Sequence, residues 1–165
     1  MRRLAPRIDL DQFVSYRLSV LSSAWGAASA RFYRKRFGLA LREWRVLAVL
    51  SGRGGETGTP ASEIVRLTAV EKAGISRALA SLERRGLIAR AWSDSDGRRS
   101  LVALTTNGRA LLRRLVPAAL ARQALLVGAL TAVERKTFFT LLGKLERRVA
   151  ELDGASGPPA RRKRR

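Results

Sequence analysis

Residues 67–104 read LTAVEKAGISRALASLERRGLIARAWSDSDGRRSLVAL, and the pattern of this stretch decides the fold. Its first half has apolar residues at helical spacing, opened by Glu71, whose charge suits the positive end of a helix dipole. After Gly86 the apolar period changes from 3.6 to 2, which is typical of strands. The expected elements are a helix over 72–85, strands over 87–92 and 100–104, and a polar turn over 93–99.

A second, shorter helix is expected just before this stretch. Thr59 and Pro60 have the signature of an N-cap followed by a first helical residue, and apolar residues continue to Leu67. Two short helices separated by three or four residues match the spacing of a helix-turn-helix. The hairpin that follows is then a wing. In the second helix we expect Ile75, Leu79 and Leu82 to point inward.

Longer helical patterns extend outward from this centre on both sides. Asp9 and Gln12 resemble a capping box, and Gly38 suits a helix end. Pro117 predicts a kink in the helix that follows the hairpin, and Gly128 ends that helix. Thr131 and Glu134 form a capping box for the last helix. The expected outer helices cover 10–36, 41–50, 106 to the Gly128 break, and 131 to about 152.

The fold class is therefore mainly α with a small β-hairpin wing: a winged helix-turn-helix flanked by N- and C-terminal dimerisation helices. The end helices carry more apolar surface than one winged domain can cover, which favours burial against a second copy. A two-fold homodimer would place two helices in successive major grooves of a pseudo-palindromic site. The expected division is an N-terminal arm at 1–8, dimerisation helices at 9–38 and 106–152, the winged domain at 39–105, and a disordered basic tail at 153–165.

The charge of the chain indicates a polyanionic partner. Lys and Arg number 33 against 13 Asp and Glu, a formal net charge of +20, and the last five residues are all basic. Such a charge attracts nucleic acid first, then anionic membranes or acidic proteins. A generally Arg-rich composition is the plainer alternative. The tail at 161–165 is either an electrostatic arm on DNA or a solubilising end.

Several function classes are excluded or disfavoured by missing residues and motifs. The chain has no Cys and no His, which removes disulfides, thiol chemistry, His bases and ordinary zinc, haem or iron–sulfur sites. The Gly-rich loop at 51–58 lacks the Gly-Lys-Ser/Thr ending of a phosphate-binding loop. We expect no cofactor and no enzymatic activity. Without a long apolar run or a signal core, we also expect a cytoplasmic protein with no membrane partner.

Several of these segments resemble the MarR family of transcriptional regulators. They are residues 42–47, 67–87, 93–105 and Asn107-Gly108-Arg109, and the resemblance extends over roughly 10–150. Its most specific part is Asp96-Gly97-Arg98, at the family's distance before Leu104-Thr105. The resemblance implies an intertwined homodimer, duplex-DNA binding and, often, release by a small aromatic effector. Control by cysteine oxidation, found in one branch of the family, is excluded because Cys is absent.

The DNA-binding candidates on the second helix of the motif are Lys72, Ala73, Ser76 and Arg77. Arg77 has the donors for guanine O6 and N7, Ser76 can bond a base edge or a phosphate, and Lys72 favours phosphate. Ala73 and Gly74 would let the backbone approach the groove. An ordinary solvated helix face is the alternative for Ser76 and Arg77.

In the wing, Arg98 and Arg99 stand where a hairpin tip would lie along the duplex, and an Arg there can enter the minor groove. The resemblance assigns Asp96 to hold an Arg in place, because a bare carboxylate beside phosphates would repel them. Turn chemistry is the alternative for Asp96. Three further arginines are either phosphate contacts or ordinary surface residues: Arg84, Arg85 and Arg90.

The resemblance also implies an effector cleft between the dimerisation helices and the winged domain. Its candidate residues are Phe13, Tyr16, Arg17 and Trp44, which would supply aromatic walls and a cation. The alternative places Phe13 and Trp44 in the core and Arg17 on the surface.

The leading function is a sequence-specific repressor of transcription. A non-specific, architectural DNA-coating protein without effector response is the alternative.

Overall fold

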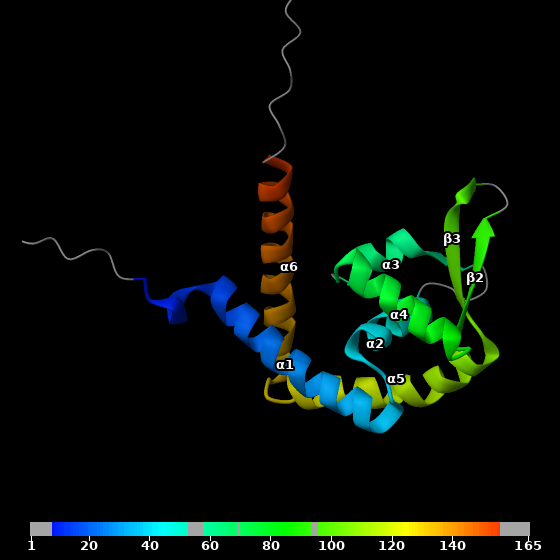
Figure 1. Ribbon diagram of the computed structural model, residues 1–165. Coiled ribbons are helices and arrows are strands. Elements are labelled where there is room, and N and C mark those ends of the chain that lie inside the picture. The colour runs from blue at the N-terminus through cyan, green and yellow to red at the C-terminus, as the bar shows by residue number, and fades with distance from the viewer. Residues whose placement is uncertain (1–7, 53–57, 69, 94–95, 156–165) are drawn as a thin grey trace, which may run out of the picture. The chain divides into compact units, whose positions relative to one another are not determined.

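The computed structural model describes residues 8–52, 58–68, 70–93 and 96–155, without the side chains of 92–100 and 154–155. The chain divides into two compact units, Met1–Pro117 and Ala118–Arg165, and each is described by itself. A mainly helical fold with a small β-hairpin is confirmed (Figure 1). The elements are η1 (Leu10–Gln12), α1 (Val14–Phe37), α2 (Leu41–Gly52), β1 (Thr59–Pro60), α3 (Ala61–Thr68), α4 (Lys72–Arg84), β2 (Ile88–Ser93), β3 (Asp96–Leu104), α5 (Thr106–Val127) and α6 (Ala132–Ala155).

The first unit has one apolar core, built from α2, α3, α4, the base of the hairpin and the start of α5. Figure 1 shows α3 and α4 next to each other, with the hairpin of β2 and β3 beside them. The three inward residues expected on α4 are confirmed, since Ile75, Leu79 and Leu82 are buried. Other fully buried side chains include Leu39, Val46, Leu47, Leu50, Ile64, Ile88, Val102 and Leu115.

The start of α3 differs from the expected helix start. Thr59 and Pro60 form the short strand β1, antiparallel to β3, with Thr59 opposite Val102. The helix therefore begins at Ala61, and the prediction of a Thr59 N-cap is wrong. Gly58, at φ +78°, turns the chain into the strand. Pro60 is tolerated because β1 is an edge strand of the sheet, whose order is β1-β3-β2.

The hairpin is longer than the polarity pattern predicted. Strand β3 begins at Asp96, and Ser93 pairs with Asp96, so the turn expected over 93–99 is wrong at Ser93 and at 96–99, while residues 94 and 95 lie outside the described part of the chain. The pairing shifts register between Trp92 and Ser93. Backbone hydrogen bonds continue the strands, whereas the side chains beyond Trp92 lack the apolar alternation that marks a strand in the sequence.

The N-terminal helix is interrupted near its start. Asp9 caps a single 3-10 turn, accepting from the Asp11 amide at 3.1 Å, and α1 begins only at Val14. The expected helix from residue 10 is therefore wrong at its first turn. Gly38 ends α1 as predicted, in the left-handed conformation at φ 63°, and its amide donates to the Arg34 carbonyl.

The two C-terminal helices begin as predicted. α5 runs through Pro117, which is also where the first compact unit ends, and stops before Gly128. The capping box of α6 is confirmed: the Thr131 amide donates to Glu134 Oε2 at 2.8 Å, and the Glu134 amide donates to Thr131 Oγ1 at 3.3 Å. α6 extends to Ala155, so the tail predicted from residue 153 starts too early. The basic residues at 161–165 lie outside the described part of the chain.

None of the described helices is by itself long and apolar enough to cross a bilayer. The bent pair of α5 and α6 reaches that length and apolar composition only when both helices are counted together.

Candidate DNA interface

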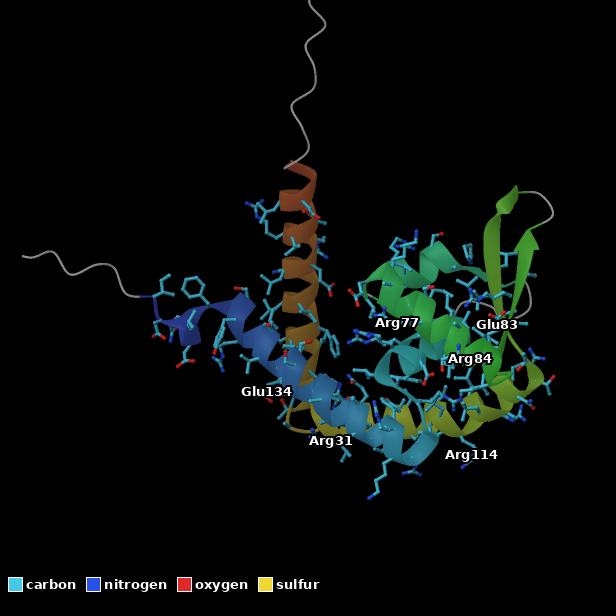
Figure 2. The ribbon with its side chains drawn as sticks, in the orientation of Figure 1. Arg31, Arg77, Glu83, Arg84, Arg114 and Glu134 are labelled. Carbon is cyan, nitrogen blue, oxygen red and sulfur yellow. The ribbon has the colours of Figure 1, made fainter. Side chains whose placement is uncertain are left out.

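Helix α4 has two faces with opposite properties, and this sets which side chains reach a partner. Ile75, Leu79 and Leu82 fix the helix against the core, whereas Lys72, Ala73, Ser76 and Arg77 are all exposed. Figure 2 shows Arg77 and Arg84 on α4, two turns apart and therefore on one side of the helix. The structure thus brings the four candidates of this helix onto one solvent-facing surface.

The N-terminus of α4 carries an acid whose side chain does not cap the helix. Glu71 occupies the N-cap position but makes no side-chain capping hydrogen bond. Its Oε1 instead lies 3.6 Å from Nη2 of Arg77 and 3.6 Å from Nη2 of Arg42, which comes from α2. No sequence pattern indicated that these three residues would meet.

Gly74 does not face the groove side of α4, so the prediction that it lets the backbone approach DNA is wrong. It is buried, and a Cβ at this position would lie 3.2 Å from Nε of Arg42 and 3.2 Å from Cγ1 of Val70. The missing side chain makes room for α2 rather than for a nucleic acid. Ala73, one residue earlier, is exposed.

A hollow of about 350 Å³ lies beside the exposed face of α4. Lys72 and Ser76 line it from α4, Ala61 and Ser62 from α3, and Arg90 from β2. The Arg90 Nε also lies 3.1 Å from a Glu83 carboxylate oxygen. Arg90 therefore lies near the candidate residues with its charge partly balanced.

Arg85, which the sequence left as either a phosphate contact or a surface residue, makes contacts within the fold. Its Nη1 lies 3.3 Å from Oε2 of Glu43 and donates to the Gly38 carbonyl at 3.2 Å. Glu43 is buried, accepts from the Ala40 amide at 2.7 Å, and accepts from the Ser81 hydroxyl at 2.6 Å. This network ties the end of α4 to the start of α2, so Arg85 is a structural residue. Glu43, three residues after the N-cap position of α2, had a recognisable local signal.

The base of the wing is fixed by polar contacts that the sequence did not reveal. Thr105 donates its hydroxyl to the Gly86 carbonyl at 2.6 Å and its amide to the Leu87 carbonyl at 3.2 Å. Arg109 donates to the Leu104 carbonyl at 2.7 Å. The structure gives backbone positions for Asp96, Arg98 and Arg99 in β3, but their side chains lie outside the described set.

A model of the MarR family matches residues 37–99. The HTH-type transcriptional repressor Rv2887 of Mycobacterium tuberculosis is 34% identical over 108 residues, which are 66% of this chain and 76% of the relative. This chain belongs to the MarR family. Its members are DNA-binding regulators of transcription, and the helix-turn-helix with a wing is the fold that this MarR-family chain shows.

Solved MarR-family structures agree over most of the chain. The MarR/EmrR family regulator from Acinetobacter sp. ADP1 matches with a TM-score of 0.78 and 26% identity, covering 87% of this chain and 99% of that one. BpsR of Bordetella bronchiseptica matches with a TM-score of 0.74 and 26% identity, covering 86% and 98%. DNA binding by BpsR is regulated by 6-hydroxynicotinic acid.

The effector-cleft candidates of this MarR-family chain are not all brought together. Tyr16 and Arg17 line a surface hollow of about 610 Å³ along the start of α1, and Phe13 is exposed nearby. Trp44 is half-buried on α2 and stacks on Tyr33, with ring centroids 4.9 Å apart. Trp44 is therefore part of the packing between α1 and α2.

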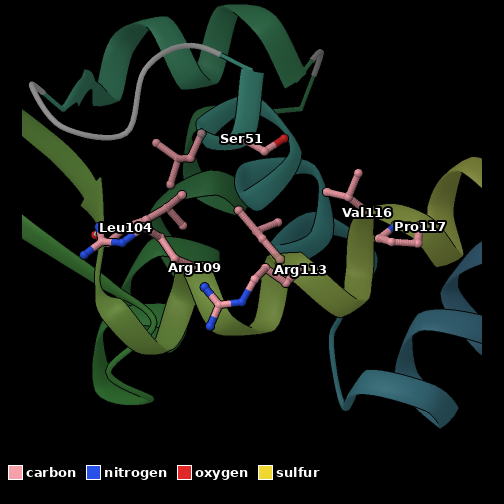
Figure 3. A pocket seen from close by; sticks show the side chains of 8 residues that line it. Ser51, Leu104, Arg109, Arg113, Val116 and Pro117 are labelled. Carbon is pink, nitrogen blue, oxygen red and sulfur yellow. The ribbon is translucent and has the colours of Figure 1, made fainter.

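Another hollow, of about 660 Å³, combines apolar walls with two cations (Figure 3). Leu50 and Ser51 line it from α2, Leu104 from the end of β3, and Leu112 and Val116 from α5. Arg109 and Arg113, one turn apart on α5, supply the charge. Within the described residues this hollow touches three elements, including the strand that ends the wing.

Proposed function

We propose that this chain is a homodimeric, sequence-specific repressor that binds a pseudo-palindromic duplex site with α4 in the major groove. The observation that carries the proposal is the exposed face of α4, where Lys72, Ser76 and Arg77 lie opposite a fully buried apolar face. Short polar and basic side chains near the N-terminal half of such a helix suit base and phosphate contacts. The relative Rv2887 is a transcriptional repressor, which favours repression over activation. Because its target is chromosomal DNA, we also propose a cytoplasmic location.

A dimer formed by residues 9–38 and 106–152 is supported by uncovered apolar side chains. No residue from Ala132 to Asp153 is buried. Large exposed apolar surfaces mark protein interfaces, and a second copy offers a matching one. The exposed apolar residues at 10–21 and on α6 include Leu10, Phe13, Val14, Val20, Leu21, Phe138, Phe139, Leu141, Leu145, Val149 and Leu152.

The wing supplies the second proposed DNA contact. Strand β3 carries Arg98 and Arg99 toward the hairpin tip, and an arginine there can enter a narrow minor groove. Asp96 is proposed to hold one of these arginines. The basic residues at 161–165 would add contacts to phosphates that do not depend on base sequence.

A small aromatic or phenolic acid is the proposed effector. The hollow between α2, β3 and α5 supports this, because apolar walls beside Arg109 and Arg113 suit an anionic aromatic molecule. The earlier candidates Phe13, Tyr16 and Arg17 offer one cation along a single helix. Titration of benzoate and pyridine carboxylates into the protein–DNA complex tests this, with release expected for wild type and weakened release for Arg113→Ala. Release weakened by Arg17→Ala instead would assign the effector to α1.

The proposed function is tested by selecting bound duplexes from a random pool and footprinting the selected site at about 0.15 M salt. We expect a discrete two-fold symmetric site, with half-sites about 34–36 Å apart. Arg77→Ala should weaken binding to that site by about 1–3 kcal/mol and relax one base position. Uniform protection of any duplex would support an architectural, DNA-coating protein instead.

A further inference from the structure

A negative charge stands at the N-terminal end of α4, next to its exposed face. Glu71 precedes the first helical residue, Lys72, in a chain where basic residues outnumber acids 33 to 13. Its side chain is 64% exposed, and those of Arg42 and Arg77 are 52% and 67% exposed, so the contacts between them add little to folding. A carboxylate beside phosphates also costs binding energy. The helix dipole favours an acid at this position, and its contacts with two arginines at the DNA-facing side of α4 point to a further function in DNA reading.

The geometry gives one oxygen to two arginines from different helices. Oε1 of Glu71 lies 3.6 Å from Nη2 of Arg42 and from Nη2 of Arg77. Gly74 makes this arrangement accessible, because any Cβ there would lie 3.2–3.3 Å from Nε and Cδ of Arg42. The side chain of Arg42 therefore crosses the first turn of α4 where a side chain would otherwise stand.

Holding Arg77 by one end of its guanidinium has a consequence for base reading. A guanidinium has five N–H donors in a rigid plane, and a guanine takes two of them at O6 and N7. With Nη2 paired to Glu71 at 3.6 Å, the other donors of the guanidinium stay available for a base. An arginine without this partner is free to turn toward any phosphate, which raises affinity for every sequence.

We propose that Glu71 is a specificity-determining residue: it positions Arg77 for a base contact and opposes unspecific phosphate binding, while Arg42 is an additional phosphate contact supplied by α2. This inference rests on the proposed function of α4 as the helix that reads DNA. Penalising the wrong partner is a common route to specificity. Here the Glu71 carboxylate repels phosphates near the first turn of α4, and this weakens binding to any duplex that lacks the base pair that Arg77 recognises.

The test compares binding of the full-length protein to its selected site and to a scrambled duplex of the same composition, over a range of salt. Glu71→Gln keeps the shape of the side chain and removes its charge. We expect tighter binding to the scrambled duplex, a salt slope steeper by about 0.9 for each phosphate gained, and a specificity ratio about tenfold lower. Arg42→Ala should weaken both duplexes to a similar extent and make the slope shallower by about 1.

Glu151→Gln is the matched control, because Glu151 is equally exposed, pairs with Arg148 at 3.1 Å and lies on α6. It makes the same change of net charge and should leave the specificity ratio unchanged. If Glu71→Gln behaves like this control while Arg77→Ala still weakens the selected site, the inference is overturned and the proposed function stands. If Arg77→Ala has no effect on the selected site, α4 does not read the bases, and both fail.

Discussion

The winged region buries its apolar side chains, whereas helix α6 leaves its apolar side chains exposed. Around α4, apolar side chains from four helices and the hairpin are buried within one chain, and Leu47, Ile64 and Ile75 are completely inaccessible. Along α6, Phe139, Leu141 and Val149 are at least half exposed. The winged region can therefore fold around its own core, whereas α6 has a core only if another surface covers it.

The strongest way to break the winged region is to add one methyl group at Gly108. A Cβ there would overlap the carbonyl oxygen of Leu87, which is backbone and cannot turn aside. Gly108→Ala should lower the free energy of unfolding by about 3–5 kcal/mol, a size reached by few substitutions. Chemical denaturation followed by tryptophan fluorescence measures it.

Gly143→Ala in α6 is the control for Gly108→Ala. At position 143 the nearest atom to a new Cβ is Nη1 of Arg147 at 3.9 Å, so no overlap occurs. Gly143 is half-buried, and replacing a helical glycine by alanine where the new Cβ meets no close neighbour should stabilise by up to about 1 kcal/mol. Equal effects of the two substitutions would show that the close packing of Gly108 on Leu87 does not govern stability.

Truncating one leucine in the core and one on α6 should have different effects on stability. Leu47→Ala creates a cavity in a closed core and should cost about 2–5 kcal/mol at any protein concentration. Leu145, 43% exposed on α6, should instead affect association: Leu145→Ala should make the melting temperature depend more strongly on protein concentration. Sedimentation velocity together with thermal unfolding separates the two effects. A concentration-independent loss for Leu145→Ala would argue against a dimer interface on α6.

The smallest expected effect concerns the first turn of α6. Hydrogen bonds from the backbone amide and the hydroxyl of Thr131 hold the pKa of Glu134 below its ordinary value. The stabilisation from the ionised carboxylate is therefore complete above the unfolded-state pKa and is lost as pH falls through the lower folded-state pKa. Thr131→Ala should raise the pKa of Glu134 toward its ordinary value and cost about 1 kcal/mol through loss of the cap.

An NMR titration of the Glu134 side-chain carboxyl checks this prediction. Thr140→Ala is the matched control, because Thr140 donates its hydroxyl to the Lys136 carbonyl within the same helix, far from the cap. It should leave the pKa of Glu134 unchanged. If Thr131→Ala leaves the pKa of Glu134 unchanged, the capping box is not the cause of its lowered pKa.

Much of the fold was predictable because its signals are local. The inward face of α4, the left-handed Gly38 and the capping box at Thr131 each depend on residues within a few positions of one another. The exposed positions of Lys72, Ala73, Ser76 and Arg77 follow from the same helical period. Their roles on DNA remain predictions, as do those of Asp96, Arg98 and Arg99.

The sequence by itself determined the helical and strand periods, the helix ends, the positive charge and the absence of Cys and His. Only the tertiary structure decided that Thr59 pairs with Val102 rather than capping a helix, that Glu43 joins Ser81 and Arg85 across 38 and 42 residues, and that Glu71 joins Arg42 to Arg77. The reason is physical. Periodicity and capping are short-range preferences of the chain, whereas strand pairing and ion pairs between helices form between residues that only folding brings together.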